Sequence, residues 1–170
     1  MKTSTVTPES KITTGDGKYT STTGPDGQGR TFSSQEIQTA LGFVASWLGV
    51  EELYPEQATC LLSLFIGVHV VGLLPTSFGK TFAFLGLPIL YDFLFNGDPR
   101  SRETVVFDPV IIVLSPLVAL MAEHCKMFNS KATTNMTRRF AAHISGKQRD
   151  SSIFARVAAR DAMYSNLHVP

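Results

Sequence analysis

The stretch that most restricts the fold of this chain is an apolar run followed at once by a short turn and a Gly-Lys-Thr tripeptide. Residues 70–74 are Val-Val-Gly-Leu-Leu, residues 75–78 form the turn, and Gly79-Lys80-Thr81 begin a second apolar segment. In a strand–turn–helix arrangement, backbone N–H groups of the turn and of the helix N-terminus converge on one point and bind phosphate oxygens. The junction therefore predicts a buried strand, a helix and a nucleotide phosphate site between them.

Each residue type at this junction has an expected role toward a triphosphate. The Lys80 ammonium would lie at the terminal phosphates, and the Thr81 hydroxyl would coordinate Mg²⁺. The turn residues that would contribute to ATP binding are Thr76, Ser77, Phe78 and Gly79. Leu74 stands where the pattern G-x-x-x-x-G-K-[ST] has its first glycine. The tripeptide alone therefore leaves another P-loop NTPase or a nucleotide kinase open as an alternative.

Hydrophobic periodicity and capping signals predict strands that alternate with helices. Ser33 and Glu36 have the spacing of a capping box, and Gly49 suits a helix end. Pro88 is expected to kink the helix that follows the tripeptide. The expected helices are 34–48, 56–66, 80–95, 117–128 and 148–160, and the expected strands are 68–74, 110–115, 140–144 and 164–169. This alternation predicts an α/β fold built on a parallel sheet with flanking helices.

Composition divides the chain into a tail and one domain. Residues 1–30 contain eight threonines and five glycines but few apolar side chains. Such a segment buries too little apolar surface to offset the entropy lost on ordering. We therefore expect a disordered tail over residues 1–32 and a domain over residues 33–170.

Several classes of protein are disfavoured by the sequence. Cys60 and Cys125 lie far apart and form no CxxC pair, which argues against a zinc site and a disulfide-linked partner. The first residues lack the apolar core of a secretory signal. Residues 58–79 carry no Asp, Glu, Lys or Arg and are long enough to cross a bilayer. His69 and Pro75 interrupt this stretch, so we expect no membrane association.

Charge is distributed unevenly along the chain. Residues 1–123 carry 7 Lys/Arg and 12 Asp/Glu, whereas residues 124–170 carry 8 Lys/Arg and 2 Asp/Glu. A basic segment can approach a nucleic-acid backbone through its phosphates. A solvated basic face without a partner is the alternative interpretation.

Four segments resemble the motifs of RecQ-like DNA helicases, and they occur in the order found in that family. Residues 74–81, Leu-Pro-Thr-Ser-Phe-Gly-Lys-Thr, resemble the first motif, which reads apolar-Pro-Thr-Gly-x-Gly-Lys-Ser/Thr. Residues 111–121 resemble motif Ia through Ser-Pro-Leu-x-x-Leu-Met after an apolar strand. Residues 53–57, Leu-Tyr-Pro-Glu-Gln, resemble the motif whose glutamine reads adenine, and residues 164–170 resemble the strand that ends in Ser-Pro-Glu or Ala-Pro-Glu. The resemblance extends over roughly the last two thirds of the chain.

The resemblance implies part of a RecA-like, ATP-binding motor lobe of superfamily two. In such an enzyme ATP with Mg²⁺ drives 3′-to-5′ unwinding of DNA in the nucleus. Gln57 would read adenine, and Ser115, Pro116 and Leu117 would bind single-stranded DNA or a duplex junction. Pro88 is a further likeness, since it matches a proline downstream of the loop in that family.

The chain also departs from the family pattern. Ser77 replaces a glycine, and Tyr54 replaces a usual arginine beside the adenine-reading glutamine. No Asp-Glu-x-His box follows Lys80 within these 170 residues, and no second motor lobe with its arginine finger is present. We therefore assign no catalytic residue and expect the 170 residues alone to hydrolyse ATP only at background rate. A truncated or decayed helicase copy without catalytic function is the main alternative.

Overall fold

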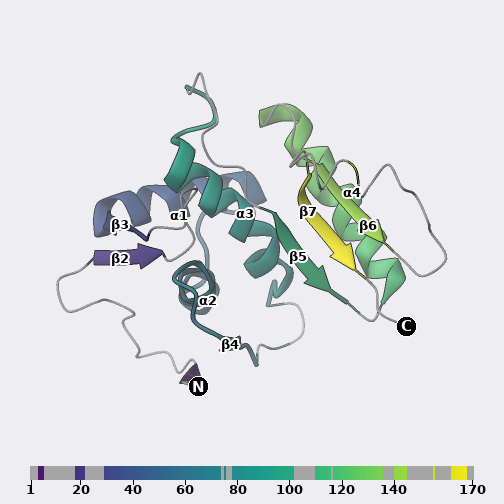
Figure 1. Ribbon diagram of the computed structural model, residues 1–170, viewed down its shortest axis with the longest axis horizontal. Coiled ribbons are helices and arrows are strands. Elements are labelled where there is room, and N and C mark those ends of the chain that lie inside the picture. The colour runs from purple at the N-terminus through teal and green to yellow at the C-terminus, as the bar shows by residue number, and fades with distance from the viewer. Residues whose placement is uncertain are drawn as a thin grey trace. The chain divides into compact units, whose positions relative to one another are not determined.

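The structure is a computed structural model, and it describes residues 4–5, 18–21, 29–73, 75, 78–101, 110–115, 117–135, 140–144, 155 and 162–167. They belong to two compact units, Met1–Gly97 and Asp98–Pro170. In chain order the elements are β1 (Ser4–Thr5), β2 (Lys18–Ser21), β3 (Arg30–Ser33), α1 (Ser34–Leu48), α2 (Pro55–Phe65), β4 (Val70–Val71), α3 (Thr81–Asn96), β5 (Ile111–Leu114), α4 (Val118–Asn135), β6 (Phe140–Ile144) and β7 (Ala162–Leu167), as Figure 1 shows.

Local signals set both ends of α1. The Ser33 N–H donates to Glu36 Oε2 over 2.8 Å, and the Glu36 N–H donates to Ser33 Oγ over 3.3 Å. These bonds form the expected capping box, and the donated backbone bond from Ser33 lowers the pKa of Glu36. At the other end Gly49 adopts φ 80°, and its N–H donates to Ala45 and Ser46 carbonyls. A left-handed residue at this position suits glycine, so the sequence prediction for this helix is confirmed.

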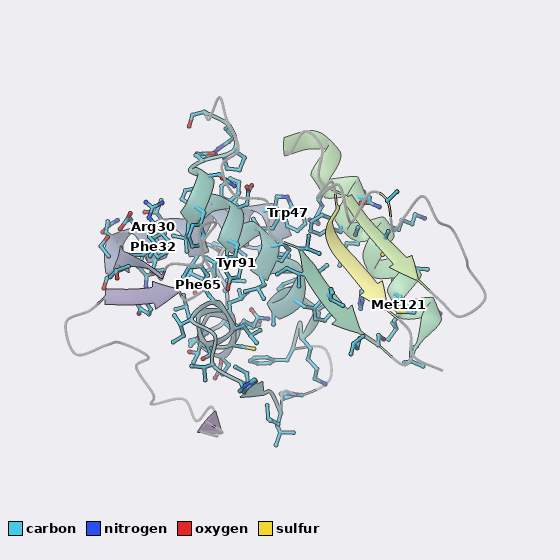
Figure 2. The ribbon with its side chains drawn as sticks, viewed as in Figure 1. Arg30, Phe32, Trp47, Phe65, Tyr91 and Met121 are labelled. Atoms are coloured by element: carbon cyan, nitrogen blue, oxygen red, sulfur yellow. The ribbon has the colours of Figure 1, made fainter. Side chains whose placement is uncertain are left out.

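Aromatic side chains form the centre of the first unit. Phe32, Phe65 and Phe95 meet with ring centroids 5.4 to 6.3 Å apart. Tyr91 joins them at 4.8 Å from Phe65, and its hydroxyl donates to the Phe65 carbonyl over 3.0 Å. Figure 2 labels Phe32, Phe65 and Tyr91 in this cluster. The cluster joins β3, α2 and α3, and therefore fixes the helix that follows the Gly-Lys-Thr tripeptide.

Strands β1 and β2 lie within the stretch that composition assigns to a tail over residues 1–32, and β3 begins in it. Strand β2 pairs antiparallel with β3, and Tyr19 lies opposite Phe32. Phe32 has no exposed surface. The strands differ from the expected tail because a composition argument averages over the whole segment. One aromatic residue at its end, Phe32, contributes to the core of the first unit.

The strand before the tripeptide is shorter and more exposed than the sequence predicts. The apolar run 68–74 gives only the two residues of β4, which pair in parallel with β1. Val71 is exposed and Leu73 is 87% exposed. The expectation of a buried strand is therefore wrong for the described residues of this run. No described helix is long and apolar enough to cross a membrane.

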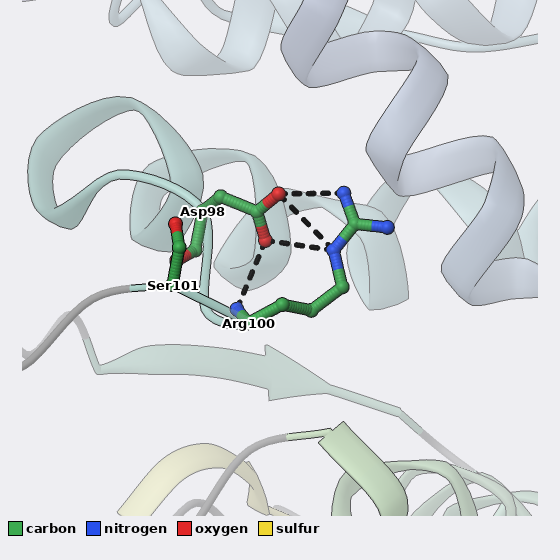
Figure 3. A network of polar contacts seen from close by, with 3 residues as sticks. All are labelled: Asp98, Arg100 and Ser101. Carbon is green, nitrogen blue, oxygen red and sulfur yellow. Dashed lines mark hydrogen bonds and ion pairs between the residues drawn. The ribbon is translucent and has the colours of Figure 1, made fainter.

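Helix α3 runs through Pro88 and ends at Asn96, close to the predicted bounds. Gly97 follows with its N–H donating to the Phe93 carbonyl over 2.9 Å. Beyond it Asp98 and Arg100 form an ion pair in which the Arg100 guanidinium donates to both carboxylate oxygens, as Figure 3 shows. The contact raises the pKa of Arg100. Because the Arg100 side chain is exposed, the pair shapes a turn more than it stabilises the fold.

The second unit contains a three-stranded parallel sheet in the order β5-β7-β6. Helix α4 packs against β6, and Met121, Cys125 and Phe128 are buried along it. The Asn129 side chain exchanges two hydrogen bonds with the backbone of Ala141, at 2.9 and 2.7 Å. The predicted strands at β5, β6 and β7 are confirmed, and α4 is longer than the predicted 117–128.

The continuous apolar run of residues 110–114 also predicts a buried strand, and for β5 this expectation is wrong. Ile112 is 64% exposed and Leu114 is 65% exposed, while Ile111 and Val113 are half-buried. A continuous apolar run does not reveal how many neighbours will cover it. The predicted helix 148–160 lies outside the described residues, except for Ala155, which is helical.

A glycine in α3 permits close packing of the three helices of the first unit. A Cβ atom on Gly86 would lie 2.9 Å from Val44 Cγ1 and 3.3 Å from Leu61 Cδ1, whereas one on Gly42 in α1 would meet nothing within 4 Å. Gly86→Ala should therefore lower the free energy of unfolding by about 1–2 kcal/mol, since overpacking outweighs the gain in helix propensity. Gly42→Ala is the matched control and should raise it by about 0.5–1 kcal/mol. Urea denaturation measures both, and equal effects of the two substitutions would contradict this packing.

Candidate nucleotide site

The candidate site is the segment 78–81, which leads into α3. Lys80 is the N-cap residue, with φ −49° and ψ −33°, and Thr81 is the first residue of the helix. The Lys80 side chain is exposed and Thr81 is half-buried. The Phe82 N–H donates to the Gly79 carbonyl over 2.8 Å. The tripeptide therefore opens a helix as predicted, with the positive end of the helix dipole at Lys80 and Thr81.

Only part of the predicted phosphate loop belongs to the described residues. Leu74, Thr76 and Ser77 lie outside the described residues. Pro75 is described, and its carbonyl accepts a hydrogen bond of 3.3 Å from the Phe78 N–H. This contact joins Pro75 to Phe78, the first and last residues of the predicted turn.

Gln57, in the first turn of α2, holds the loop through a side-chain hydrogen bond. Its Nε2 donates to the Phe78 carbonyl over 2.7 Å, and its Oε1 accepts from the Tyr54 N–H over 3.0 Å. The side chain is 3% exposed. The family resemblance predicts that Gln57 reads adenine. In the structure its amide binds the loop and the start of its own helix instead.

Gly79 has the backbone geometry and the surroundings that require glycine. Its φ is 69°, a backbone conformation that residues with a Cβ rarely adopt. A Cβ there would lie 2.7 Å from Gln57 Nε2 and 3.3 Å from the Phe82 ring. The loop therefore sits directly against the Gln57 amide, and no larger residue fits between them.

An aromatic pair lies beside the loop. The rings of Tyr54 and Phe78 stack with centroids 4.9 Å apart and an interplanar angle of 26°. Tyr54 is 57% exposed. Sequence reasoning treated Tyr54 only as a replacement for arginine and missed this contact. The signal was an aromatic residue three positions before Gln57 together with one directly before Gly79.

The residues predicted to bind nucleic acid belong to the second unit. Ser115 follows β5, and its Oγ accepts a 3.3 Å hydrogen bond from the Leu117 N–H. Leu117 is 57% exposed, and its carbonyl accepts from Met121 at 3.1 Å. Pro116 lies outside the described residues. Ser115 and Leu117 lie between the end of β5 and the start of α4.

Among the described residues, no group of three or more His, Cys, Asp or Glu side chains could hold a metal ion. Thr81, the predicted Mg²⁺ contact, is the first residue of α3, and a hydroxyl oxygen is a ligand type that suits Mg²⁺ carried by a nucleotide. Neither Cys60 nor Cys125 forms a disulfide, and burial raises the pKa of the Cys60 thiol.

Comparison with known proteins gives one family. A family model described as DEAD/DEAH box helicase matches residues 54–165. The matched stretch runs from Tyr54 of the aromatic pair, across Lys80, to β7 of the second unit. No curated protein and no solved structure matches the chain.

Proposed function

Because the chain belongs to the DEAD/DEAH box helicase family, we propose that it is the ATP- and DNA-binding part of a RecQ-like helicase that unwinds DNA in the 3′-to-5′ direction. The family match favours a helicase over a nucleotide kinase. The observation that carries the proposal is the Gly79-Lys80-Thr81 tripeptide at the start of α3, with Gln57 bound behind it. By the same resemblance the protein would act in the nucleus.

In the proposed site the helix start binds the phosphates. Lys80 brings an exposed ammonium to the positive end of the α3 dipole, so charge and dipole attract the same anionic group. Charge-assisted hydrogen bonds to phosphate are stronger than neutral ones. Mg²⁺ held by Thr81 and the nucleotide would neutralise charge on the terminal phosphates. Gly79 and Gln57 keep the loop in the shape that these contacts need.

In the second unit the proposed DNA contact is the turn between β5 and α4. The Ser115 hydroxyl and the backbone at the start of α4 suit a phosphate oxygen. Lys126 and Lys131 lie further along the same helix and add positive charge. Such contacts bind the backbone of a strand and carry no information about its sequence.

Binding to DNA should therefore be weak, independent of sequence and strongly dependent on salt. For single-stranded DNA, each neutralised phosphate contributes about −0.7 to the slope of log affinity against log salt. The double substitution Lys126→Ala with Lys131→Ala should make the slope shallower by about 1.4 if both contact phosphates. Fluorescence anisotropy with a labelled oligonucleotide measures the slope, and Lys80→Ala is the control that should leave it unchanged. An affinity insensitive to salt would rule out this surface.

A further inference from the structure

We infer that the nucleotide site recognises the triphosphate and the flat face of a base, and does not select adenine by its hydrogen-bonding edge. The inference rests on the proposed function, because it concerns the same site. It assigns Gln57 the role of a positioning residue for the loop and Tyr54 the role of the base contact. The chemical class of ligand is then a nucleoside triphosphate in general.

The first step is that the Gln57 amide is already engaged. An adenine reader must present an acceptor to the amino group and a donor to a ring nitrogen. In this chain the acceptor oxygen binds the Tyr54 N–H and the amide nitrogen binds the Phe78 carbonyl. The side chain is 3% exposed, so a base could reach its remaining hydrogen-bonding capacity only if the loop moved.

The second step is that releasing the amide would disturb the phosphate cradle. The Phe78 carbonyl and Gly79 lie against Gln57, with a Cβ at Gly79 placed only 2.7 Å from its Nε2. Turning the amide toward a base would leave the Phe78 carbonyl without this bond. A part-buried carbonyl that loses its partner is unfavourable, so holding the loop and reading the base compete for one side chain.

The third step is that an exposed ring stands where a base could stack. Tyr54 packs one face on Phe78 and remains 57% exposed. Phe78 is two residues before Lys80, so the stacked pair adjoins the segment that leads into the proposed phosphate site. Stacking on an aromatic ring tolerates any base, since every base has a π face. The ring therefore supplies affinity without discrimination between adenine and guanine.

The test compares ATP, GTP and inorganic tripolyphosphate, each with Mg²⁺, by calorimetry on the full chain. The wild type should bind ATP and GTP within about threefold of each other and tripolyphosphate on the order of tenfold more weakly. Tyr54→Ala should weaken ATP and GTP about tenfold each and leave tripolyphosphate unchanged. Tyr54→Phe keeps the ring and is the matched control, with affinities equal to wild type.

The role of Gln57 is tested by the ratio of ATP affinity to GTP affinity, which a residue that only positions the loop would not change. Gln57→Ala should weaken all three ligands by one common factor, since it acts through the loop. Gln57→Glu should weaken all three as well, because a carboxylate oxygen cannot donate to the Phe78 carbonyl. A base reader would instead alter the ATP-to-GTP ratio in Gln57→Ala, and that result would overturn the inference.

The remaining outcomes separate the inference from the proposed function. If the wild type binds none of the three ligands, the proposed phosphate site itself is wrong. If tripolyphosphate binds but ATP is more than about thirtyfold tighter than GTP, the site reads the base edge and the inference fails while the proposed function stands. Equal loss of ATP and tripolyphosphate in Tyr54→Ala would also overturn the assignment of Tyr54 as the base contact.

Discussion

Lys80→Ala should abolish detectable ATP binding, with a loss of affinity of at least about a hundredfold, and should leave the fold intact. The ammonium is exposed at the N-terminus of α3 and takes no part in the aromatic core. Removing it costs charge-assisted hydrogen bonds to the terminal phosphates, each worth about 1.5–3 kcal/mol. Calorimetry with Mg²⁺ measures the affinity, and circular dichroism reports the fold.

The matched control for this substitution is Lys126→Ala, which removes an exposed lysine from α4. It should leave the affinity for ATP unchanged. Equal ATP affinities in the wild type and in Lys80→Ala would mean that the phosphates bind elsewhere. The proposed nucleotide site at the start of α3 would then be wrong.

Phe65→Ala should lower the free energy of unfolding by about 3–5 kcal/mol. Phe65 is fully buried at the end of α2, and its ring contacts Phe32, Tyr91 and Phe95. Truncation removes those contacts and leaves a cavity that rigid helices cannot fill. Urea denaturation followed by circular dichroism gives the value.

Leu73→Ala serves as the control for Phe65, because Leu73 is a large apolar residue that is 87% exposed. It should change the free energy of unfolding by less than about 0.5 kcal/mol. A loss below about 1 kcal/mol for Phe65→Ala would show that the aromatic cluster is not the centre of a packed core.

The helices near the site were predictable because their signals are local. Ser33, Glu36 and Gly49 bound α1, and Pro55 opens α2, through contacts within a few residues of each other. The helix start at Gly79-Lys80-Thr81 follows in the same way. Strand burial was not predictable, since the exposed fractions of residues in β4 and β5 depend on neighbours far away in the sequence.

The contacts behind the phosphate loop depend on long-range geometry as well. A glutamine at position 57 fits either a base or the Phe78 carbonyl, and spacing alone does not distinguish the two. The bond joins residues 21 positions apart. The Tyr54–Phe78 stack was missed for a related reason. Aromatic residues beside Gln57 and Gly79 are visible in the sequence, but they stand in separate motifs, and their contact depends on the same long-range geometry.

The pairing of Asn129 with Ala141 has a consequence for how this protein meets other chains. Among the described strands, β6 is an edge strand of its sheet. Unpaired backbone groups on an edge strand favour strand addition and aggregation. The side-chain amide binds both the N–H and the carbonyl of Ala141 and so takes the place of a neighbouring strand at that residue. A foreign strand that extended the sheet at Ala141 would first have to displace the Asn129 amide from both of these hydrogen bonds.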